Sequence, residues 1–322
     1  MATAEQIKSL IRSHFGDDKE MFYTIALQVA AQEAQQGHGA LAHDIKEIVD
    51  TARREKRIRV SKFSSELQDW LLTEDTNIPK TALVVPTALM NRIDRIIHEC
   101  KQQHILKSHG LFHRRKIMLI GPPGTGKTMT TRVLAHEVRL PLYTVQVDKL
   151  VTKFMGETSA KLRQIFELIQ QEQGVYLFDE FDAIGGARSM ENDVGEMRRV
   201  LNAFLQFIEH DRSDSLIVAA TNSPKLLDRA LFRRFDDVLY YAEPESDDRR
   251  KLMRNILGEF FTTDFVWKKV LVESKGLSHA EIAQACRDAI KHVILADINK
   301  VSDSLLQQTL KERQGAHQKL QR

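Results

Sequence analysis

A glycine-rich segment is the first place where residue types and spacing could do chemistry. It runs Gly-Pro-Pro-Gly-Thr-Gly-Lys-Thr and fits the pattern G-x-x-x-x-G-K-T. Its glycines let the backbone curl so that N–H groups point at phosphate oxygens. Lys127 would reach the β- and γ-phosphates of a nucleotide, and the Thr128 hydroxyl would hold Mg²⁺. The predicted phosphate-binding residues are Gly121, Pro122, Pro123, Gly124, Thr125, Gly126, Lys127 and Thr128.

The flanking sequence favours a phosphate loop over a glycine- and proline-rich turn that fits the pattern by chance. Residues 116–120 form a short apolar run typical of a buried parallel strand. The pattern from Thr128 onward predicts a helix. The N-terminus of such a helix presents its positive end to bound phosphate.

Two adjacent carboxylates end the next predicted strand. Residues 175–178 are apolar and are followed by Asp179 and Glu180. In isolation such a pair could be ordinary turn chemistry, but a carboxylate at the tip of a strand faces the ligand crevice of an open α/β sheet. We expect Asp179 to bind nucleotide and metal through water, and Glu180 to orient and polarise the attacking water. For Asp182 a helix cap and a subunit contact both stay open.

A third strand, residues 215–222, ends at Asn222, whose amide could contact a γ-phosphate or the attacking water. Arg233 and Arg234 follow soon after, within Leu-Phe-Arg-Arg-Phe. An arginine delivered in trans to a γ-phosphate stabilises the charge of the transition state. We predict this role for the pair and leave open which arginine touches phosphate.

The four motifs, in this order and spacing, resemble the AAA+ ATPases. The branch is the one that contains the FtsH protease, the proteasomal ATPases, katanin and spastin, and the resemblance covers roughly residues 80–305. It indicates a compact bacterial AAA ATPase with a short helical N-terminal domain. It implies Mg²⁺-dependent ATP hydrolysis in a ring, usually a hexamer, with ATP bound between subunits. It identifies Lys127 with the Walker A lysine, Asp179 and Glu180 with the Walker B carboxylates, Asn222 with the sensor, and Arg233 and Arg234 with the arginine fingers.

Three departures from the family pattern accompany this resemblance. Many relatives have Arg-Pro-Gly-Arg-Phe-Asp, whereas this chain has residues 233–236, Arg-Arg-Phe-Asp, which is closer to katanin-like members. His-Asp-Arg-Ser-Asp, residues 210–214, replaces the usual Asp-Gly-Phe before the sensor strand. Residues 275–282 resemble the turn that contacts adenine, with His279 in place of Gly and Glu281 in place of Asp.

A second candidate site lies between the phosphate loop and Asp179. In the resembling families a Lys-aromatic-aliphatic-Gly segment lines the central pore, and Lys153, Phe154, Met155 and Gly156 match it. An aromatic beside a flexible apolar residue can intercalate between the side chains of any extended polypeptide. The alternative is that Phe154 and Met155 are core residues of a strand-to-helix connection. With the resemblance, the segment predicts a protein substrate.

Composition supports that prediction over nucleic-acid binding. Lys and Arg number 47 against 44 Asp and Glu, and a net charge of +3 is not that of a dedicated DNA binder. The basic run 53–62 is interpreted as a solvated linker. The alternative function is a nucleic-acid-linked AAA+ helper of transposition or clamp-loading type. A scaffold that does not hydrolyse ATP is disfavoured by the intact acidic and arginine pairs.

The leading hypothesis is a ring ATPase that remodels, unfolds or threads a protein. No HExxH motif is present, so we expect any proteolysis to come from a separate polypeptide; similar compact bacterial AAA ATPases are often paired with a subtilisin-like serine protease. No apolar stretch could cross a membrane and no signal peptide begins the chain. Cys100 and Cys286 show no paired spacing. The histidines and cysteine at positions 98, 100, 104, 109 and 113 match no zinc-binding template. We therefore predict a cytoplasmic protein.

The expected fold is α/β: a three-layer P-loop core whose parallel five-stranded sheet has the family's order 5-1-4-3-2, with a helical lid and a helical N-terminal part. Three short helices are expected in the first fifty residues, where their function is either partner recruitment or a ring-stabilising collar. A helix over 88–105 precedes the core. The predicted domains are 1–52, an N-terminal partner or substrate module; 53–85, a linker; 86–243, the large ATPase domain; 244–310, the helical lid; and 311–322, a mobile tail.

Overall fold

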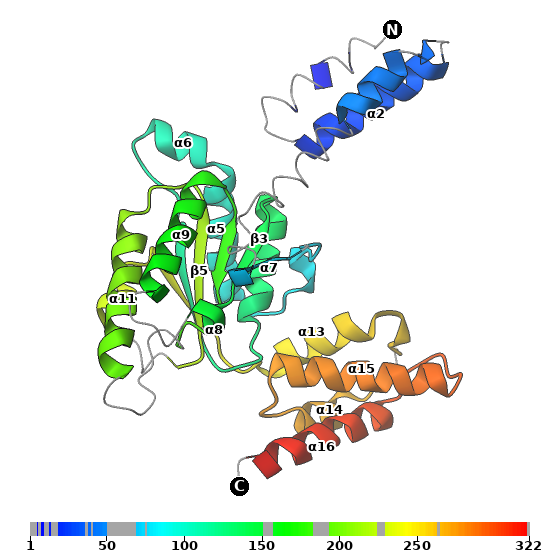
Figure 1. Cartoon of the computed structure of the whole chain (residues 1–322). Coiled ribbons are helices and arrows are strands. Elements are labelled where there is room, and N and C mark those ends of the chain that lie inside the picture. The colour runs from blue at the N-terminus through cyan, green and yellow to red at the C-terminus, as the bar shows by residue number, and fades with distance from the viewer. Residues whose placement is uncertain are drawn as a thin grey trace. The chain divides into compact units, whose positions relative to one another are not determined.

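The computed structural model describes most of the chain from residue 69 onward and part of the sequence before it (Figure 1). Its contacts divide the chain into two compact units, Met1–Glu66 and Leu67–Arg322. The described residues are 5, 8–9, 13, 19–35, 38–39, 41–49, 69–74, 76–150, 157–182, 193–223, 229–262 and 265–320.

The first unit is helical where it is described. The second expected helix is present as α2, Lys19–Gln35, and residues 41–49 are also helical. Apolar residues of α2 at 25, 26, 29 and 30 are buried, as a one-sided apolar stripe predicts. The first expected helix falls largely outside the described residues.

The second unit is built on a mixed six-stranded sheet. Its five parallel strands are β2 (Lys116–Ile120), β3 (Leu142–Val145), β4 (Val175–Phe178), β5 (Leu216–Thr221) and β6 (Asp237–Tyr240). They lie in the order β3-β4-β5-β2-β6. Numbered 1 to 5 in chain order, these strands have the predicted order 5-1-4-3-2.

The strand count is a correction to the prediction. β1, Leu71–Glu74, pairs antiparallel with β3 and extends the sheet at that edge, although the sequence analysis placed these residues in a linker. Only Leu71 of this strand is buried, and Leu72 is exposed. Glu74 accepts hydrogen bonds from Arg132 Nε and Thr144 Oγ1, each at 2.7 Å. A four-residue edge strand held partly by polar contacts has no apolar periodicity to reveal it.

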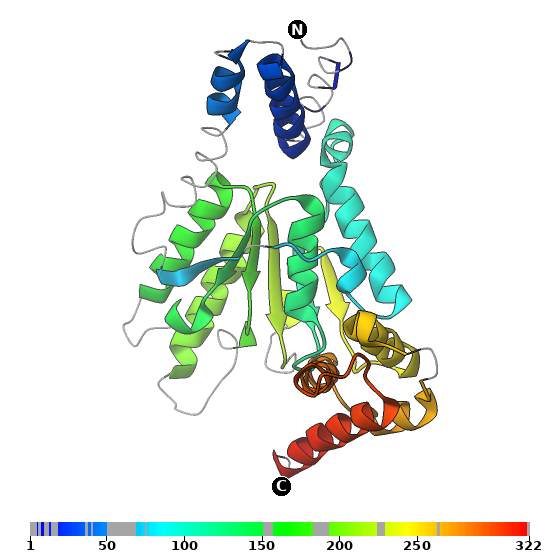
Figure 2. The same cartoon turned by 90° about the vertical axis from the view of Figure 1, so that its right-hand side faces the viewer.

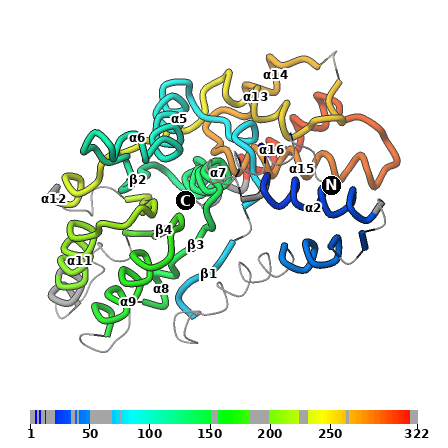
Figure 3. The backbone as a smooth tube through the Cα atoms, turned by 90° about the horizontal axis from the view of Figure 1, so that it is seen from above, coloured from blue at the N-terminus to red at the C-terminus, as the bar shows by residue number. Residues whose placement is uncertain are grey.

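Helices cover both faces of the sheet (Figure 3). On one face, α5 (Thr87–Lys101) and α7 (Lys127–Val138) share a buried cluster with Ile117 and Leu119. On the other, α9 (Glu157–Gln171) and α11 (Asp193–His210) pack together, and Phe166 and Phe204 contact Phe178. The central strands β2, β4 and β5 are therefore buried on both sides, which explains their nearly continuous apolar runs. Figure 2 shows the strands between the two helical layers.

The predicted helix over 88–105 is divided. It ends at Lys101, and after Gln102 the short helix α6 follows at Gln103–Ser108. Among its described residues the large domain also contains three short helical segments: η1 (Lys80–Ala82), α8 (Val147–Leu150) and α12 (Arg229–Phe232).

The predicted lid is helical, with its own core. It contains α13 (Ser246–Leu257), η3 (Gly258–Phe260), α14 (Trp267–Glu273), α15 (His279–Leu295) and α16 (Asp303–Leu320). Met253, Val270 and Ile282 are fully buried in this core, which also takes in Val84 from the lead-in segment. α16 continues to Leu320, into the segment that was expected to be a mobile tail. Within the described residues, none of these helices has the length and apolarity needed to cross a membrane.

Candidate active site

The carboxyl edge of the parallel sheet gathers most of the predicted site residues. Gly121 directly follows β2, Asp179 follows β4, and Asn222 follows β5. Because β4, β5 and β2 are parallel neighbours, their carboxyl ends meet at one edge of the sheet. Three segments that are far apart in the sequence thus converge there.

Lys127 is the charged centre of this edge. Its Nζ donates to the carbonyls of Gly121 and Pro122 at 2.7 and 2.8 Å and to Asn222 Oδ1 at 2.7 Å. Burial lowers the pKa of this lysine, while the negative charges of Asp179 and Asp182 oppose that shift. The amine is therefore held by three oxygen atoms that a phosphate could replace.

The proposed metal ligands are in direct contact. Thr128 Oγ1 donates to Asp179 Oδ2 at 2.8 Å, which links the start of α7 to the end of β4. The Glu180 backbone N–H donates to Asp179 Oδ1 at 2.9 Å. Glu180 has φ = 50°, in the left-handed region that non-glycine residues rarely adopt, and its side chain is exposed. Such backbone strain is concentrated at functional sites.

Asp182 has a role that the sequence analysis did not predict. Its Oδ1 accepts hydrogen bonds from Thr221 Oγ1 at 3.2 Å and from the Asn222 backbone N–H at 3.4 Å. It therefore ties the segment after β4 to the tip of β5, where Asn222 contacts Lys127. Its spacing from Asp179 did not reveal this contact, because the partner lies on another strand.

The backbone of the phosphate loop is held from two sides. A Cβ on Gly121 would lie 2.4 Å from the carbonyl oxygen of Tyr241, so the loop passes directly against the end of β6. The Tyr241 hydroxyl donates to Thr130 Oγ1 at 2.7 Å and fixes the same residue to α7. Tyr241 lies in the core and shows no motif, which explains why sequence reasoning missed it.

The lid turn at the start of α15 approaches the loop from the other side. The Ala280 N–H donates to the Gly124 carbonyl at 3.0 Å, and a Cβ on Gly124 would meet Ser278 Oγ at 2.8 Å. Glu281 accepts from the Ser278 N–H at 2.8 Å in a capping box. Glu281 is therefore engaged in capping α15, beside the buried residue His279.

Arg233 and Arg234 lie at the opposite end of the sheet. They precede β6, and Asp236, two residues after Arg234, donates its N–H to the carbonyl of Lys116 at the start of β2. The phosphate loop begins where β2 ends. A strand of five residues spans roughly 16 Å, so the arginines of a chain are about one strand length away from its own phosphate loop.

The predicted pore-loop residues, Lys153, Phe154, Met155 and Gly156, lie outside the described residues. The flanking elements are described: α8 ends at Leu150 and α9 begins at Glu157. The pore-loop assignment stays a prediction.

Comparison with known families identifies the domain that carries this edge. The family model "ATPase family associated with various cellular activities (AAA)" matches residues 117–242, from β2 to just beyond β6. This chain contains an AAA-family ATPase domain. Members of the AAA family hydrolyse ATP with Mg²⁺, and the chain is accordingly an ATPase.

Two relatives and one solved structure give the extent of the similarity. The uncharacterized AAA family ATPase y4kL of Sinorhizobium fredii is 29% identical over 316 residues, covering 94% of this chain and 93% of that protein. A putative 26S proteasome regulatory subunit homolog of Methanothermobacter marburgensis is 31% identical over 204 residues, and the match covers 62% of this chain and 55% of that protein. The chain therefore spans about half the length of this second AAA relative. The crystal structure of the FIGL-1 AAA domain has a TM-score of 0.61 at 22% identity, covering 79% of this chain and 90% of that one, and supports the fold.

The AAA site fits ATP and Mg²⁺ by its own chemistry. A Cβ at Gly121 or Gly124 would collide with neighbouring atoms, so the loop keeps its backbone uncovered by side chains of its own. Lys127 offers a partly desolvated cation at the start of a helix, where N–H groups also favour an anion. The Thr128 hydroxyl and the Asp179 carboxylate are the hard oxygen ligands that Mg²⁺ prefers.

Proposed function

We propose that this AAA ATPase works as a ring of identical copies, hexameric as in many AAA+ proteins, in which an arginine of one copy completes the ATP site of the next. The observation that carries the proposal is the distance of Arg233 and Arg234 from the phosphate loop of their own chain. Hydrolysis needs positive charge on the γ-phosphate as the transition state forms. The copy that supplies the loop cannot supply this arginine across the full length of β2.

Five residues at the carboxyl edge would divide the remaining work. Lys127 would exchange its oxygen partners for the β- and γ-phosphates. Thr128 and Asp179 would hold Mg²⁺, which neutralises phosphate charge when bound. Glu180 would accept a proton from the attacking water, and Asn222, already beside Lys127, would orient that water or the γ-phosphate.

A mixing experiment tests the completion of each site by a neighbour. Lys127→Ala alone should not bind ATP, and the double variant R233A/R234A alone should not hydrolyse it. Mixed, the two should regain turnover, because loops of the double variant then receive arginines from the Lys127→Ala chains. The control is each variant mixed with itself at the same total concentration. Mixtures as inactive as the separate variants would contradict the proposal.

The proposed substrate of the ring is an extended protein chain. Matched relatives carry the printed names proteasome-activating nucleotidase and ATP-dependent zinc metalloprotease FtsH 1, and both names point to protein handling. The segment Lys153–Gly156 supplies an aromatic and a flexible apolar side chain for gripping polypeptide without reading its sequence. Phe154→Ala should keep ATP hydrolysis and lose protein remodelling. Phe154→Tyr is the matched control, which keeps an aromatic ring and should still remodel protein. Unchanged remodelling by Phe154→Ala would favour the alternative that Phe154 is a core residue.

A variant that binds ATP without hydrolysing it can be used to identify the partner. The Glu180→Gln variant should bind ATP without turning it over, so proteins held by the ring remain bound during purification. Because the sequence contains no HExxH motif, we propose that a protease partner, if one is captured, is a separate polypeptide of subtilisin-like type. Unpaired, buried Cys100 and Cys286 are in keeping with the reducing cytoplasm that we propose as its compartment.

We also propose a role for the segments that precede the ATPase core. Residues 1–52 would recruit a partner or substrate, and the part of the expected linker 53–85 that precedes β1 would join them to the core. Deleting residues 1–52 should leave basal ATP hydrolysis intact and abolish partner binding. Loss of assembly instead would favour the collar interpretation.

A nucleic-acid-linked helper is the alternative function. It would show a steep rise of ATP hydrolysis with added DNA that disappears at higher salt. The near-balanced charge of the chain and the pore-loop segment favour the protein substrate.

A further inference from the structure

The two adjacent arginines differ in their surroundings. The Nε and one terminal nitrogen of Arg234 lie 3.4 Å from Glu209 Oε2, near the C-terminal end of α11. The Arg234 backbone N–H also donates to the Leu231 carbonyl at 3.0 Å, which closes the turn after α12. Arg233 is exposed and has no hydrogen bond or ion pair among those recorded for the described residues.

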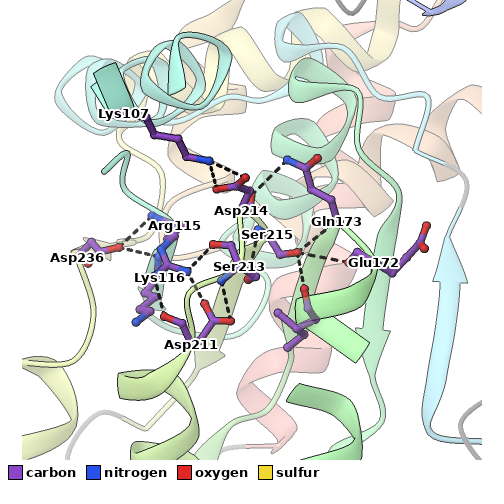
Figure 4. A network of polar contacts seen from close by, with 12 residues as sticks. Lys107, Arg115, Lys116, Glu172, Gln173, Asp211, Ser213, Asp214, Ser215 and Asp236 are labelled. Atoms are coloured by element: carbon purple, nitrogen blue, oxygen red, sulfur yellow. Dashed lines mark hydrogen bonds and ion pairs between the residues drawn. The ribbon is translucent and has the colours of Figure 1, made fainter. Parts of the chain in front are cut away.

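The end of α11 that carries Glu209 is itself anchored in the core (Figure 4). Asp211 is fully buried and forms an ion pair with Arg115, whose side chain is 8% exposed. The Arg115 guanidinium also donates to the Asp211 carbonyl at 2.7 Å and to the Ser213 carbonyl. A buried, hydrogen-bonded ion pair has little freedom to move, so Glu209 is presented from a fixed helix end.

The residues that follow Arg234 are also bonded to the start of β2. The Asp236 carboxylate accepts hydrogen bonds from the N–H groups of Arg115 and Lys116, both at 2.9 Å (Figure 4). Arg234 is thus held between two contacts to residues at the start of β2. On one side Asp236 bonds to Arg115 and Lys116; on the other, Arg234 pairs with Glu209, and the adjoining Asp211 pairs with Arg115. The side chain of Arg233 is exposed and takes part in none of these contacts.

From this asymmetry we infer that Arg233 is the arginine that acts on the neighbouring copy's phosphate, and that Arg234 is a positioning residue held by Glu209. The inference rests on the proposed function, since it assigns roles within a site shared by two copies. Arg233 has all of its guanidinium donors available for a phosphate. Arg234 commits Nε and a terminal nitrogen to a carboxylate on its own chain, which fixes the turn that carries Arg233.

The test uses the mixing assay with a constant acceptor, R233A/R234A, whose own arginines are absent. Donor chains all carry Lys127→Ala, so they hydrolyse no ATP themselves and contribute only arginines. Adding Arg233→Ala to the donor should lower the restored turnover about a thousandfold, as for loss of an arginine finger. Adding Arg234→Ala should lower it only about fivefold, and Glu209→Ala by the same factor, because a partly exposed ion pair is weak. With both Glu209→Ala and Arg234→Ala the loss should be no larger than with Arg234→Ala alone.

Two controls separate positioning from general damage. Glu167→Ala in the donor removes another exposed glutamate, from α9, and should leave the restored turnover unchanged. Glu209→Ala placed in the acceptor should also have no effect, since the acceptor has no arginine left to position. Pull-down of tagged donor with untagged acceptor checks that each variant still assembles.

The outcomes are distinguishable. No rescue by the Lys127→Ala donor alone would contradict the proposed function and this inference with it. Rescue that is lost equally with Arg233→Ala and Arg234→Ala would overturn the division of roles, because both arginines would then act on phosphate. An effect of Glu209→Ala that is the same in acceptor and donor, or absent from the donor, would overturn the positioning role.

Discussion

At the scale of single residues, the site is held together by a few hydrogen bonds among its own residues. Lys127 has three oxygen partners, one of them the Asn222 amide. Asp182 fixes the backbone of Asn222, and Asp179 fixes the Thr128 hydroxyl. The contacts of Lys127 and Thr128 join the start of α7 to the ends of β5 and β4, and the contact of Asp182 joins the ends of β4 and β5 to each other. A movement of Lys127 or Thr128 on nucleotide binding would therefore also displace the residues that follow β4 and β5.

Glu180→Gln tests the catalytic carboxylate. The amide cannot accept the proton of the attacking water, so ATP hydrolysis should fall by at least about a hundredfold while ATP affinity changes little. Turnover is measured as phosphate release and affinity by titration with a fluorescent ATP analogue. Glu172→Gln, at a glutamate that precedes β4, is a control that should hydrolyse ATP normally. Normal ATP turnover in Glu180→Gln would mean that another residue accepts the proton of the attacking water.

His113 gives the chain a predictable response to acid. Burial lowers its pKa, with Asp214 opposing the shift and Arg115 and Lys107 adding to it. The unfolded chain therefore binds a proton near the ordinary pKa of 6.5 that the folded chain resists, so stability should fall as the pH drops below about 6.5. At higher pH both states are neutral and the histidine contributes no pH dependence.

Replacing His113 by Phe should flatten the fall of Tm between about pH 6.5 and 5. His279 has its pKa lowered by burial in the same direction, so part of the slope should remain. His104→Gln, at an exposed position, serves as the comparison. An unchanged slope in His113→Phe would mean that acid acts through other groups.

At the scale of elements, β6 connects the two edges of the sheet to which we assign a function. It starts soon after Arg233 and Arg234 and is followed directly by Tyr241, which contacts both Gly121 and Thr130. The Tyr241 N–H continues the ladder by donating to the Ile120 carbonyl at 2.7 Å. One strand thus joins the ATP site of a copy to the arginines that the copy would offer its neighbour.

Gly121→Ala tests this close approach. The new Cβ would lie 2.4 Å from the Tyr241 carbonyl oxygen, so either the loop or β6 must move. The free energy of unfolding should fall by about 1–3 kcal/mol, and ATP affinity should fall with it. Gly315→Ala, in α16 with nothing within 4 Å of the new Cβ, should instead be neutral or stabilise the chain. Urea unfolding of both variants makes the comparison, and equal stabilities would contradict the close contact.

How far the sequence predicts these elements depends on the signal that each one leaves. The central strands β4 and β5 are apolar and buried along their whole length apart from the terminal Thr221, and the polar residues Asp179 and Asn222 that follow them mark the carboxyl edge. β1 left no such signal, because a short edge strand with an exposed Leu72 has neither alternation nor a continuous apolar run. The helix over 88–105 was predicted as continuous, since nothing in its pattern marks the break at Gln102.

The same reasoning explains which parts of the site were found. Motif residues such as Lys127 and Asp179 were recognisable because their chemistry requires a local spacing. Tyr241, Glu209 and Asp236 act through partners on distant elements, and no local pattern identifies them. The sequence placed Arg233 and Arg234 in the mechanism, but only the fold shows that they lie at the far end of β2 from their own loop.

At the scale of the whole molecule, the proposed function requires that one chain carry two incomplete halves of a catalytic site. The carboxyl edge of the sheet holds the phosphate loop, the acidic pair and Asn222, whereas the arginines lie at the amino edge. A head-to-tail contact between copies would bring these halves together, and such contacts close into rings when the rotation permits. The ATPase activity of this AAA domain should therefore depend on assembly.

The most direct test of that claim is the ATP turnover per chain as a function of protein concentration, with particle mass measured in parallel. We predict that dilution lowers turnover per chain steeply and in step with the loss of the assembled form, and that R233A/R234A stays inactive at every concentration. Turnover per chain that stays constant down to concentrations where only single copies remain would contradict the account.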